Sequence, residues 1–294
     1  MIRQGHICQV ALFPHNFWYK LSSVLLGNMA ETFFMNFFFN RLMKKVQFNP
    51  DVIVVIKGSL LNSSNYDCLK NKYANSKFVL YIWDDINLDK KELDIIGYFD
   101  KICSYNPMDC KEYGFTFRPM FFDQSMNLSH INKSIDLYYI ASYRKNRLDF
   151  ICKLLDNMCR NALKYKVVLK CNPLLILSDI KNLGKLHFFR ILPIEYSEMI
   201  RDLAKSKCCV ELCRPHQKSL STRPFEALGT RTKVITTNKN IASYNFFIPQ
   251  NILIVDEKNP VVPENWLDSP YIEVDNKILE QYTLCRFVEE LLCV

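Results

Sequence analysis

Residues 219–238 read SLSTRPFEALGTRTKVITTN, and this stretch decides the fold class because it joins a loop, a short helix and a strand. Ser221 or Thr222 is suited to cap the helix, and Pro224 fits its first turn. Gly229 is suited to end the helix, and the run VITT that follows it predicts a buried strand. A short helix leading directly into a buried strand is typical of α/β proteins.

Short apolar, β-branched runs bounded by polar or turn residues recur on both sides of that stretch. They predict buried parallel strands at residues 52–56, 78–83, 101–104, 137–141, 167–170, 208–212, 234–237 and 252–255. Apolar residues at helical spacing predict helices between many of them, at 146–163, 197–206, 224–229 and 278–292. Strands that alternate with helices predict an α/β protein with doubly wound parallel sheets.

The strand pattern is interrupted at residues 117–135, which show no clear period. We therefore expect two Rossmann-like domains, residues 1–122 and residues 123–277, and a C-terminal helix at 278–294 that packs back on the molecule. In open α/β sheets, ligands bind at the carboxyl ends of the strands. In a two-domain protein of this class, we expect the ligand in the cleft between the domains.

The composition fits a folded protein and excludes some kinds of site. The chain has 294 residues, 49% of them apolar, which is ample material for a core. It has only 7 glycines, well below the average share of roughly 7%, and none forms a Gly-rich phosphate loop. The net charge of +8 favours anionic partners. No nucleic-acid-binding motif is present, so nucleic acid is not an expected partner.

The twelve cysteines lie mostly inside or beside apolar runs and form no CxxC pair. We expect them to be buried, reduced thiols, which points to a cytoplasmic protein without a bound metal. Residues 17–45 are strongly apolar, but charged and amide side chains interrupt them, so a membrane-spanning helix is not expected. The sequence favours a buried core helix there. The alternative is a helix lying on the inner leaflet, with Phe33, Phe34, Phe37 and Phe38 inserted.

The chemistry of the 219–238 stretch suits an anion. The start of its helix offers free backbone N–H groups, and Arg223 adds a two-pronged donor for phosphate. Glu226 lies one turn further on, where its carboxylate could accept hydrogen bonds from two adjacent hydroxyl groups, as in a ribose. The alternative is a surface helix on which Glu226 pairs with Lys233 or Arg231.

Residues 223–229 (RPFEALG), followed by 234–238 (VITTN), resemble the donor-site motif of GT-B glycosyltransferases, most closely the CgeB-like and bacterial polysaccharide transferases. Residues 100–118 are similar to the end of that family's first domain, and residues 136–148 to the opening of its second. The resemblance covers roughly residues 78–256. Together with the composition, it suggests an enterobacterial lipopolysaccharide-core transferase for rhamnose or another deoxyhexose.

The resemblance implies an acceptor-side domain at 1–122 and a nucleotide-sugar donor domain at 123–277. Glu226 would bind the ribose, and the other implied donor-binding residues are Arg223, Thr222, Ser221, Tyr143, Arg144, Lys170, Thr237 and Asn238. Side chains and a helix start, rather than a metal or a cofactor, would neutralise the departing diphosphate. The sequence has no DxD motif, in agreement with this expectation.

The candidates for the general base are Asp84, Asp85 and His216. The two aspartates follow a predicted strand of the first domain, although both could simply be loop or capping residues. His216 lies near the donor motif, where a loop histidine is usually just solvated. Many retaining members of the family carry a Glu eight residues before the matched one. Lys218 stands there, so the stereochemical outcome stays open.

The expected partners are a nucleotide-sugar donor, lipopolysaccharide or another lipid-linked saccharide as acceptor, and the inner face of the inner membrane. The alternative is a non-catalytic binding or scaffold protein on the same fold, because a fold does not fix a function.

Overall fold

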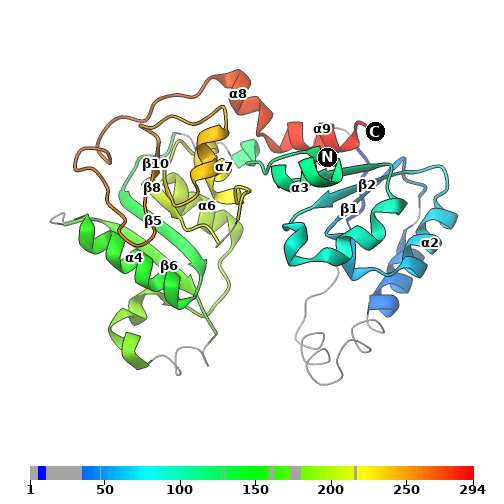
Figure 1. Ribbon diagram of the computed structural model, residues 1–294, viewed down its shortest axis with the longest axis horizontal. Coiled ribbons are helices and arrows are strands. Elements are labelled where there is room, and N and C mark those ends of the chain that lie inside the picture. Colours follow the sequence, from blue (N-terminus) through cyan, green and yellow to red (C-terminus); the bar gives the residue numbers. More distant parts are fainter. Residues whose placement is uncertain are drawn as a thin grey trace. The chain divides into compact units, whose positions relative to one another are not determined.

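The computed structural model describes residues 6–10, 35–46, 48–126, 128, 130–158, 162–172, 180–214 and 217–294. The chain forms two compact units (Figure 1). Unit 1 comprises Met1–Pro119 and Phe287–Val294, and unit 2 comprises Met120–Arg286. Each unit contains one parallel sheet with helices packed on it, which confirms the predicted fold class. The described part of the chain has no helix that is both long and apolar enough to cross a bilayer.

The sheet of unit 1 has four parallel strands in the order of the sequence. They are β1 (Val52–Ile56), β2 (Lys77–Ile82), β3 (Lys101–Ser104) and β4 (Thr116–Phe117). Right-handed crossovers between strands in sequential order place their connections on one face. These connections are η2 (Gly58–Leu60), α2 (Ser63–Lys72), η3 (Ile86–Leu88), η4 (Lys90–Tyr98) and α3 (Pro107–Tyr113). Tyr66, Phe78, Leu80 and Ile95 belong to the core between them and the sheet.

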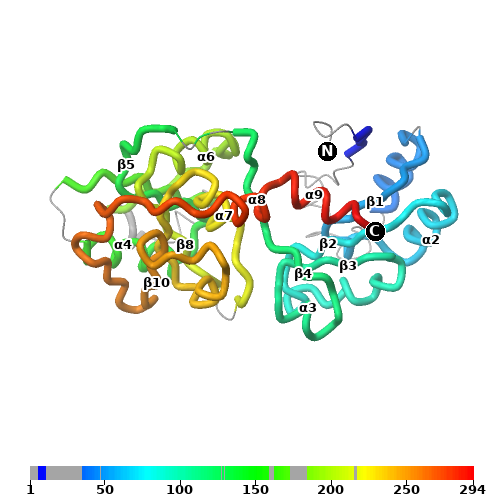
Figure 2. The backbone as a smooth tube through the Cα atoms, turned by 90° about the horizontal axis from the view of Figure 1, so that it is seen from above, coloured from blue at the N-terminus to red at the C-terminus, as the bar shows by residue number. Residues whose placement is uncertain are grey.

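The opposite face of this sheet receives the end of the chain. Helix α9 (Leu284–Leu292) runs near β2 (Figure 2). Its Phe287 ring lies edge-on to the Tyr81 ring of β2, with 4.9 Å between ring centroids. The Lys101 ammonium donates to the carbonyl oxygens of Glu290 and Cys293, each at 2.6 Å. A cation at this position satisfies the last carbonyl groups of the helix.

A helix over residues 35–45 buries Met35 and Phe39 in the core of unit 1. This part of the apolar segment therefore agrees with the core-helix prediction. Phe37 points outward and is 54% exposed, whereas Phe33 and Phe34 lie outside the described residues.

The sheet of unit 2 has six parallel strands in the order β10-β9-β8-β5-β6-β7. The strands are β5 (Ile135–Ser142), β6 (Tyr165–Lys170), β7 (Phe189–Arg190), β8 (Ser206–Glu211), β9 (Lys233–Thr236) and β10 (Ile252–Ile254). The connecting segments include α4 (Lys145–Asn157), η6 (Ile180–Phe188), α6 (Tyr196–Ala204), α7 (Thr222–Gly229) and η7 (Lys239–Ser243). The strand order reverses between β5 and β8, which makes this pair the topological switch point.

Two helices occupy the region where the sequence predicts one C-terminal helix at 278–294. Helix α8 (Asn276–Gln281) ends before Tyr282, and α9 begins at Leu284. Between them the chain pairs with Phe122, whose N–H donates to the Tyr282 carbonyl at 2.9 Å. The Tyr282 ring is buried 5.0 Å from the ring of Phe246, and its hydroxyl donates to Asn245 at 2.7 Å. These contacts take the backbone out of the helical path.

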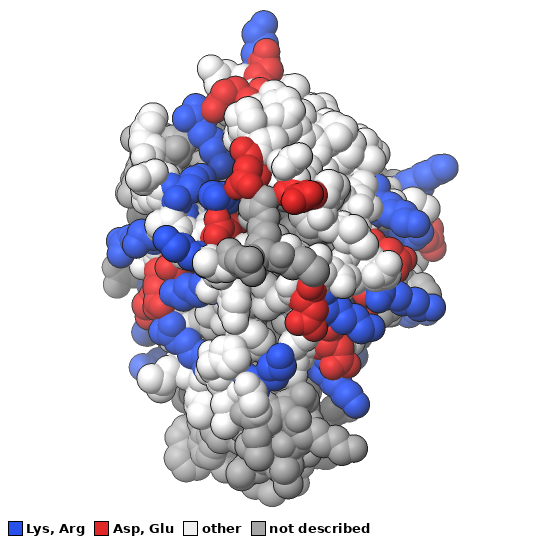
Figure 3. Space-filling view, turned by 90° about the vertical axis from the view of Figure 1, so that its left-hand side faces the viewer, with Lys and Arg blue, Asp and Glu red and all other residues white. Residues whose placement is uncertain are grey.

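The described cysteines are free, and Cys103, Cys110, Cys171, Cys208 and Cys209 are buried. On the face of unit 2 in Figure 3, the described Lys and Arg side chains lie among Asp and Glu side chains, so positive charge is not gathered into one patch there.

Candidate functional site

The switch point of unit 2 brings two helix starts to the carboxyl ends of adjacent strands. Strand β5 ends at Ser142, and α4 begins three residues later. Strand β8 ends at Glu211, and the loop after it leads to α7, whose N-cap is Ser221. In doubly wound sheets, ligands bind in the crevice outside these strand ends. The residues that follow β5 and β8 are therefore the candidates for a site.

Glu211 organises this edge of the sheet, and sequence reasoning did not select it. Its buried carboxylate accepts hydrogen bonds from the Ser221 hydroxyl at 2.6 Å and the Thr236 hydroxyl at 2.7 Å. The Ser221 N–H also donates to it, at 3.4 Å. One carboxylate thus ties β8 to β9 and to the start of α7. The only signal in the sequence is an acidic residue inside the apolar run CCVEL.

Helix α7 carries the predicted Arg223 and Glu226. Ser221 caps the helix, as its side-chain oxygen accepts from the Arg223 N–H at 3.4 Å, and Thr222 is the first helical residue. The Arg223 guanidinium lies 2.7 Å from the Glu226 carboxylate, which is only 6% exposed. The surface-helix alternative is therefore wrong for Glu226, because Arg231 pairs with Glu273 instead. Lys233 donates to carbonyl oxygens of the chain after β10.

A hollow of about 140 Å³ lies against Glu226. Tyr196, at the start of α6, and Asp123 also line it. Burial and the nearby Glu226 carboxylate raise the pKa of Tyr196, so its hydroxyl stays protonated and can act as a donor. Glu226 and Tyr196 thus border a hollow whose lining also includes the apolar side chains of Phe122, Leu128 and Ile200.

Three arginines, Arg144, Arg147 and Arg214, lie near the start of α4. Arg144 is its N-cap residue, makes no side-chain capping bond, and is followed by a first turn without acidic residues. The Arg147 guanidinium donates to the Ser142 carbonyl at 2.9 Å. Burial lowers the pKa of Arg147, and the positive charges of Arg144 and Arg214 lower it further. Cations at a helix N-terminus are unfavourable by themselves, so this arrangement is suited to an anion.

Sequence reasoning identified Arg144 but missed Arg147 and Arg214. Arg147 stands one turn further along the helix, and Arg214 follows β8, so only the pairing of β5 with β8 shows that they belong together. In the sequence, Arg147 is marked only by the basic run YRKNR at residues 143–147.

The remaining predicted donor-binding residues differ in their exposure and in the contacts that their side chains make within unit 2. Tyr143 is half-buried, with its ring 4.9 Å from the ring of Phe189, and Lys170 is exposed at the end of β6. The Thr237 hydroxyl oxygen accepts from the Cys213 N–H at 3.1 Å. Asn238 is buried, and its amide donates to the Ser219 carbonyl at 2.9 Å. Thr237 and Asn238 therefore contribute to the structure of the loops at this edge.

The catalytic candidates belong to unit 1 or lie outside the described residues. Asp84 pairs with the Lys57 ammonium at 2.8 Å. The Asp85 carboxylate accepts from the Tyr105 hydroxyl and from the Asn106 amide, each at 2.9 Å. His216 lies outside the described residues. Within the described ranges, no three His, Cys, Asp or Glu side chains gather in a way that could hold a metal ion.

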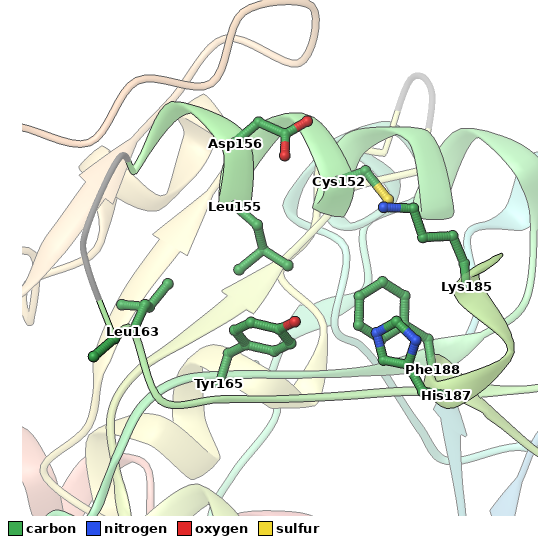
Figure 4. Close-up of a pocket in the computed structure, with 9 residues that line it drawn as sticks. Cys152, Leu155, Asp156, Leu163, Tyr165, Lys185, His187 and Phe188 are labelled. Carbon is green, nitrogen blue, oxygen red and sulfur yellow. The ribbon is translucent and has the colours of Figure 1, made fainter.

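A second hollow, of about 370 Å³, lies at the amino ends of β6 and β7 in unit 2 (Figure 4). Tyr165 at the start of β6 and Phe188 just before β7 line it, together with Cys152 of α4. The sulfur of Cys152 points toward the Lys185 ammonium (Figure 4). Burial raises the pKa of the Cys152 thiol. Because this hollow lies at the amino ends of β6 and β7, it is not part of the switch-point site.

No family model matches the chain, and no curated protein matches its sequence. Solved structures do share its fold. AviGT4, a glycosyltransferase involved in avilamycin A biosynthesis, aligns with a TM-score of 0.56 at 13% identity, over 86% of this chain and 75% of that one. The N-terminal domain of Candida albicans trehalose-6-phosphate phosphatase aligns with a TM-score of 0.52 at 10% identity, over 96% of this chain and 74% of that one. These similarities support the GT-B type of fold.

Proposed function

We propose that the protein is a glycosyltransferase that takes its sugar from a nucleotide diphosphate donor bound at the switch point of unit 2. The observation that carries this proposal is the group of Arg144, Arg147 and Arg214 beside the uncapped start of α4. A diphosphate would offset the repulsion among the three guanidinium groups and accept from the free N–H groups of the helix.

The same residues would serve the chemistry of sugar transfer. When the bond between the sugar and the diphosphate breaks, negative charge grows on the departing oxygen. Fixed positive groups stabilise that charge best, because they need no rearrangement during the reaction. In this proposal, arginines and a helix start supply the stabilisation without a bound metal. Lys170 and Tyr143 lie at the carboxyl ends of β6 and β5, at the same end of the sheet.

Glu226 would accept hydrogen bonds from the ribose hydroxyls. Its carboxylate now pairs with Arg223 at 2.7 Å, so donor binding would exchange one partner for another. Arg223 would then be free to turn toward a phosphate or the sugar, with Ser221 and Thr222 beside it. Glu211 would keep the helix start in place during this exchange, because it holds Ser221 from the strand side.

For the acceptor, we propose a lipid-linked saccharide such as lipopolysaccharide core, and for the sugar a deoxyhexose such as rhamnose. These choices follow the resemblance of residues 223–238 to polysaccharide transferases. Work at the inner face of the inner membrane is consistent with the helix at 35–45, which exposes Phe37, Arg41, Lys44 and Lys45. An exposed aromatic next to basic side chains suits an anionic lipid surface.

Calorimetric titration of UDP, dTDP and GDP into the protein tests the donor site. We expect Arg144→Met and Arg214→Met each to weaken the tightest of these complexes by roughly tenfold, the effect of losing one charge-assisted phosphate contact. Arg201→Met is the matched control, because Arg201 lies in the last turn of α6. Equal affinities in all four proteins would refute the assignment.

The alternative, a non-catalytic binding protein, is favoured by one observation. Asp84 and Asp85 are both engaged within unit 1, by Lys57 and by Tyr105 and Asn106. Nucleotide binding that depends on Arg144 and Arg214, without any sugar transfer to lipopolysaccharide extracts, would support this alternative. Transfer that is lost in Glu226→Gln would support the enzyme.

A further inference from the structure

The hollow of about 370 Å³ at the amino ends of β6 and β7 lies at the opposite end of these strands from the proposed donor site. Its volume falls within the range of roughly 300–1,000 Å³ that is typical of small-molecule sites. The second half of α4, the chain that enters β6 and the end of η6 line it. Leu154, Val167 and Phe188 anchor these segments in the core of unit 2, so the walls of the hollow are held by packing.

One wall of the hollow is aromatic. The buried Phe188 ring lies beside two exposed rings, with its centroid 4.1 Å from that of His187 and 6.1 Å from that of Tyr165. Figure 4 shows the three rings on the side of β6 and the end of η6, and Leu155 and Leu163 also line the hollow. Aromatic rings pack favourably on one another in offset or edge-on arrangements. This wall therefore fits the ring of an aromatic ligand.

Opposite charges lie on the side of α4. Asp156 belongs to α4, and the Lys185 side chain extends from η6 toward Cys152 (Figure 4). Burial raises the pKa of the Cys152 thiol, the Lys185 ammonium acts against this as a charge and as a hydrogen-bond donor, and the Asp156 carboxylate raises the pKa further. Both charged groups therefore lie near the same sulfur atom, and both line the hollow.

We propose that this hollow binds an aromatic α-amino acid. Its ring would pack on the aromatic wall, its carboxylate would accept from Lys185, and its ammonium would donate to Asp156. A ligand that fills the hollow displaces water from both head groups, so it must replace the lost hydrogen bonds. Charge-assisted hydrogen bonds do this best, because they are roughly twice as strong as neutral ones. An α-amino acid carries one charge of each sign on a single carbon, as a closely spaced pair of opposite charges requires.

Other classes of ligand match the lining less well. A simple anion would be repelled by Asp156, and a simple amine by Lys185. A nucleobase has a flat ring but no charge, and an aliphatic amino acid has both charges but no ring. The proposal does not rest on the proposed function, because the residues assigned to the nucleotide donor are not among those that line this hollow.

Saturation-transfer NMR and calorimetric titration of the full chain test the site, with L-phenylalanine, L-tyrosine and L-tryptophan as probes. We expect at least one of the three to bind. Phenethylamine lacks the carboxylate, 3-phenylpropionate lacks the amine and L-leucine lacks the ring. Each of these comparison compounds should therefore bind more weakly than the best probe, by roughly tenfold or more.

Lys185→Met and Asp156→Asn should each weaken the binding of the best probe by roughly tenfold. Tyr165→Leu should bring its affinity close to that of L-leucine. Lys153→Met and Asp149→Asn are the matched controls, because they make the same charge changes at exposed residues of α4 outside the lining. Lys185 and Asp156 are themselves exposed, so these variants should keep the melting temperature of the wild type, and lost affinity then reports a lost contact.

Failure of all three amino acids to bind, equal affinity for phenethylamine or 3-phenylpropionate, or full affinity in both Lys185→Met and Asp156→Asn would overturn the proposal. Titration of UDP into the same proteins keeps this site apart from the donor site. Arg144→Met should lose nucleotide affinity and keep the amino acid, and Lys185→Met should do the reverse. Loss of both ligands in one of these variants would show that they share a site, which would also overturn the proposal.

Discussion

Replacing Glu211 by alanine removes a carboxylate that joins β8, β9 and α7. The Ser221 and Thr236 hydroxyls donate to it at 2.6 Å and 2.7 Å, and Thr236 is fully buried. Hydrogen bonds to a charged group are worth about 1.5–3 kcal/mol each, offset in part by the cost of burying the carboxylate. Because Ser221 can turn to water while Thr236 cannot, we expect a loss of about 3 kcal/mol in the free energy of unfolding.

For a unit of this size, such a loss lowers the melting temperature by roughly 6–12 °C. Glu211→Gln keeps the shape and one acceptor oxygen, and the second hydroxyl can accept from its amide, so we expect a loss of about 1 kcal/mol. Urea unfolding measures both values, with an unchanged m-value showing that only stability changed.

A double-mutant cycle with Thr236→Val locates the effect. If the hydrogen bond at 2.7 Å carries the energy, Thr236→Val should cost clearly less in the Glu211→Ala background than in wild type. A loss below about 1 kcal/mol in Glu211→Ala, or additive single effects in the cycle, would refute the reasoning. Weaker nucleotide binding in Glu211→Gln would further indicate that the carboxylate positions the start of α7.

Three further predictions concern other parts of the fold. Gly58→Ala should lower the unfolding free energy by about 1–3 kcal/mol, because its Cβ would meet the Tyr66 hydroxyl at 2.5 Å, whereas Gly97→Ala, with open space around it, should not. Burial lowers the pKa of Lys133 to about 8, so between pH 8 and 10 the folded state binds fewer protons than the unfolded state. The free energy of unfolding of the wild type, measured in urea relative to that of Lys133→Met, should therefore rise over this range. A difference that stays constant with pH would contradict this. Lys101→Met should speed hydrogen exchange at the carboxyl end of α9, whose last carbonyls it binds, and exchange like that of wild type would speak against this role.

Much of the fold could be predicted from local patterns. The runs VIVVI at 52–56 and FVLYIW at 78–83 become β1 and β2 almost as expected, because strand formation depends on short apolar, β-branched segments. The helix over 222–229 follows from its serine cap and its terminal glycine. The two-residue strands β4 and β7 were missed, since so short a run carries no period of its own.

The sequence alone selected Arg223 and Glu226 but not their mutual pairing, and it selected Arg144 without Arg147 and Arg214. The side chains that matter at the switch point come from segments dozens of residues apart. Their proximity depends on which strand lies next to which, and neither composition nor spacing carries that information.

What the sequence by itself determined, then, is the alternation of strands and helices, the caps of α7 and the residue types available for an anion site. These are properties of neighbouring residues, whose backbone preferences act over a few ångströms. Only the tertiary structure decided that Glu211 holds the start of α7, that Lys57 meets Asp84, and that the C-terminal segment breaks at Tyr282. Each of these depends on strand order and register, which are fixed by burying apolar faces across the whole unit rather than by any local run of residues.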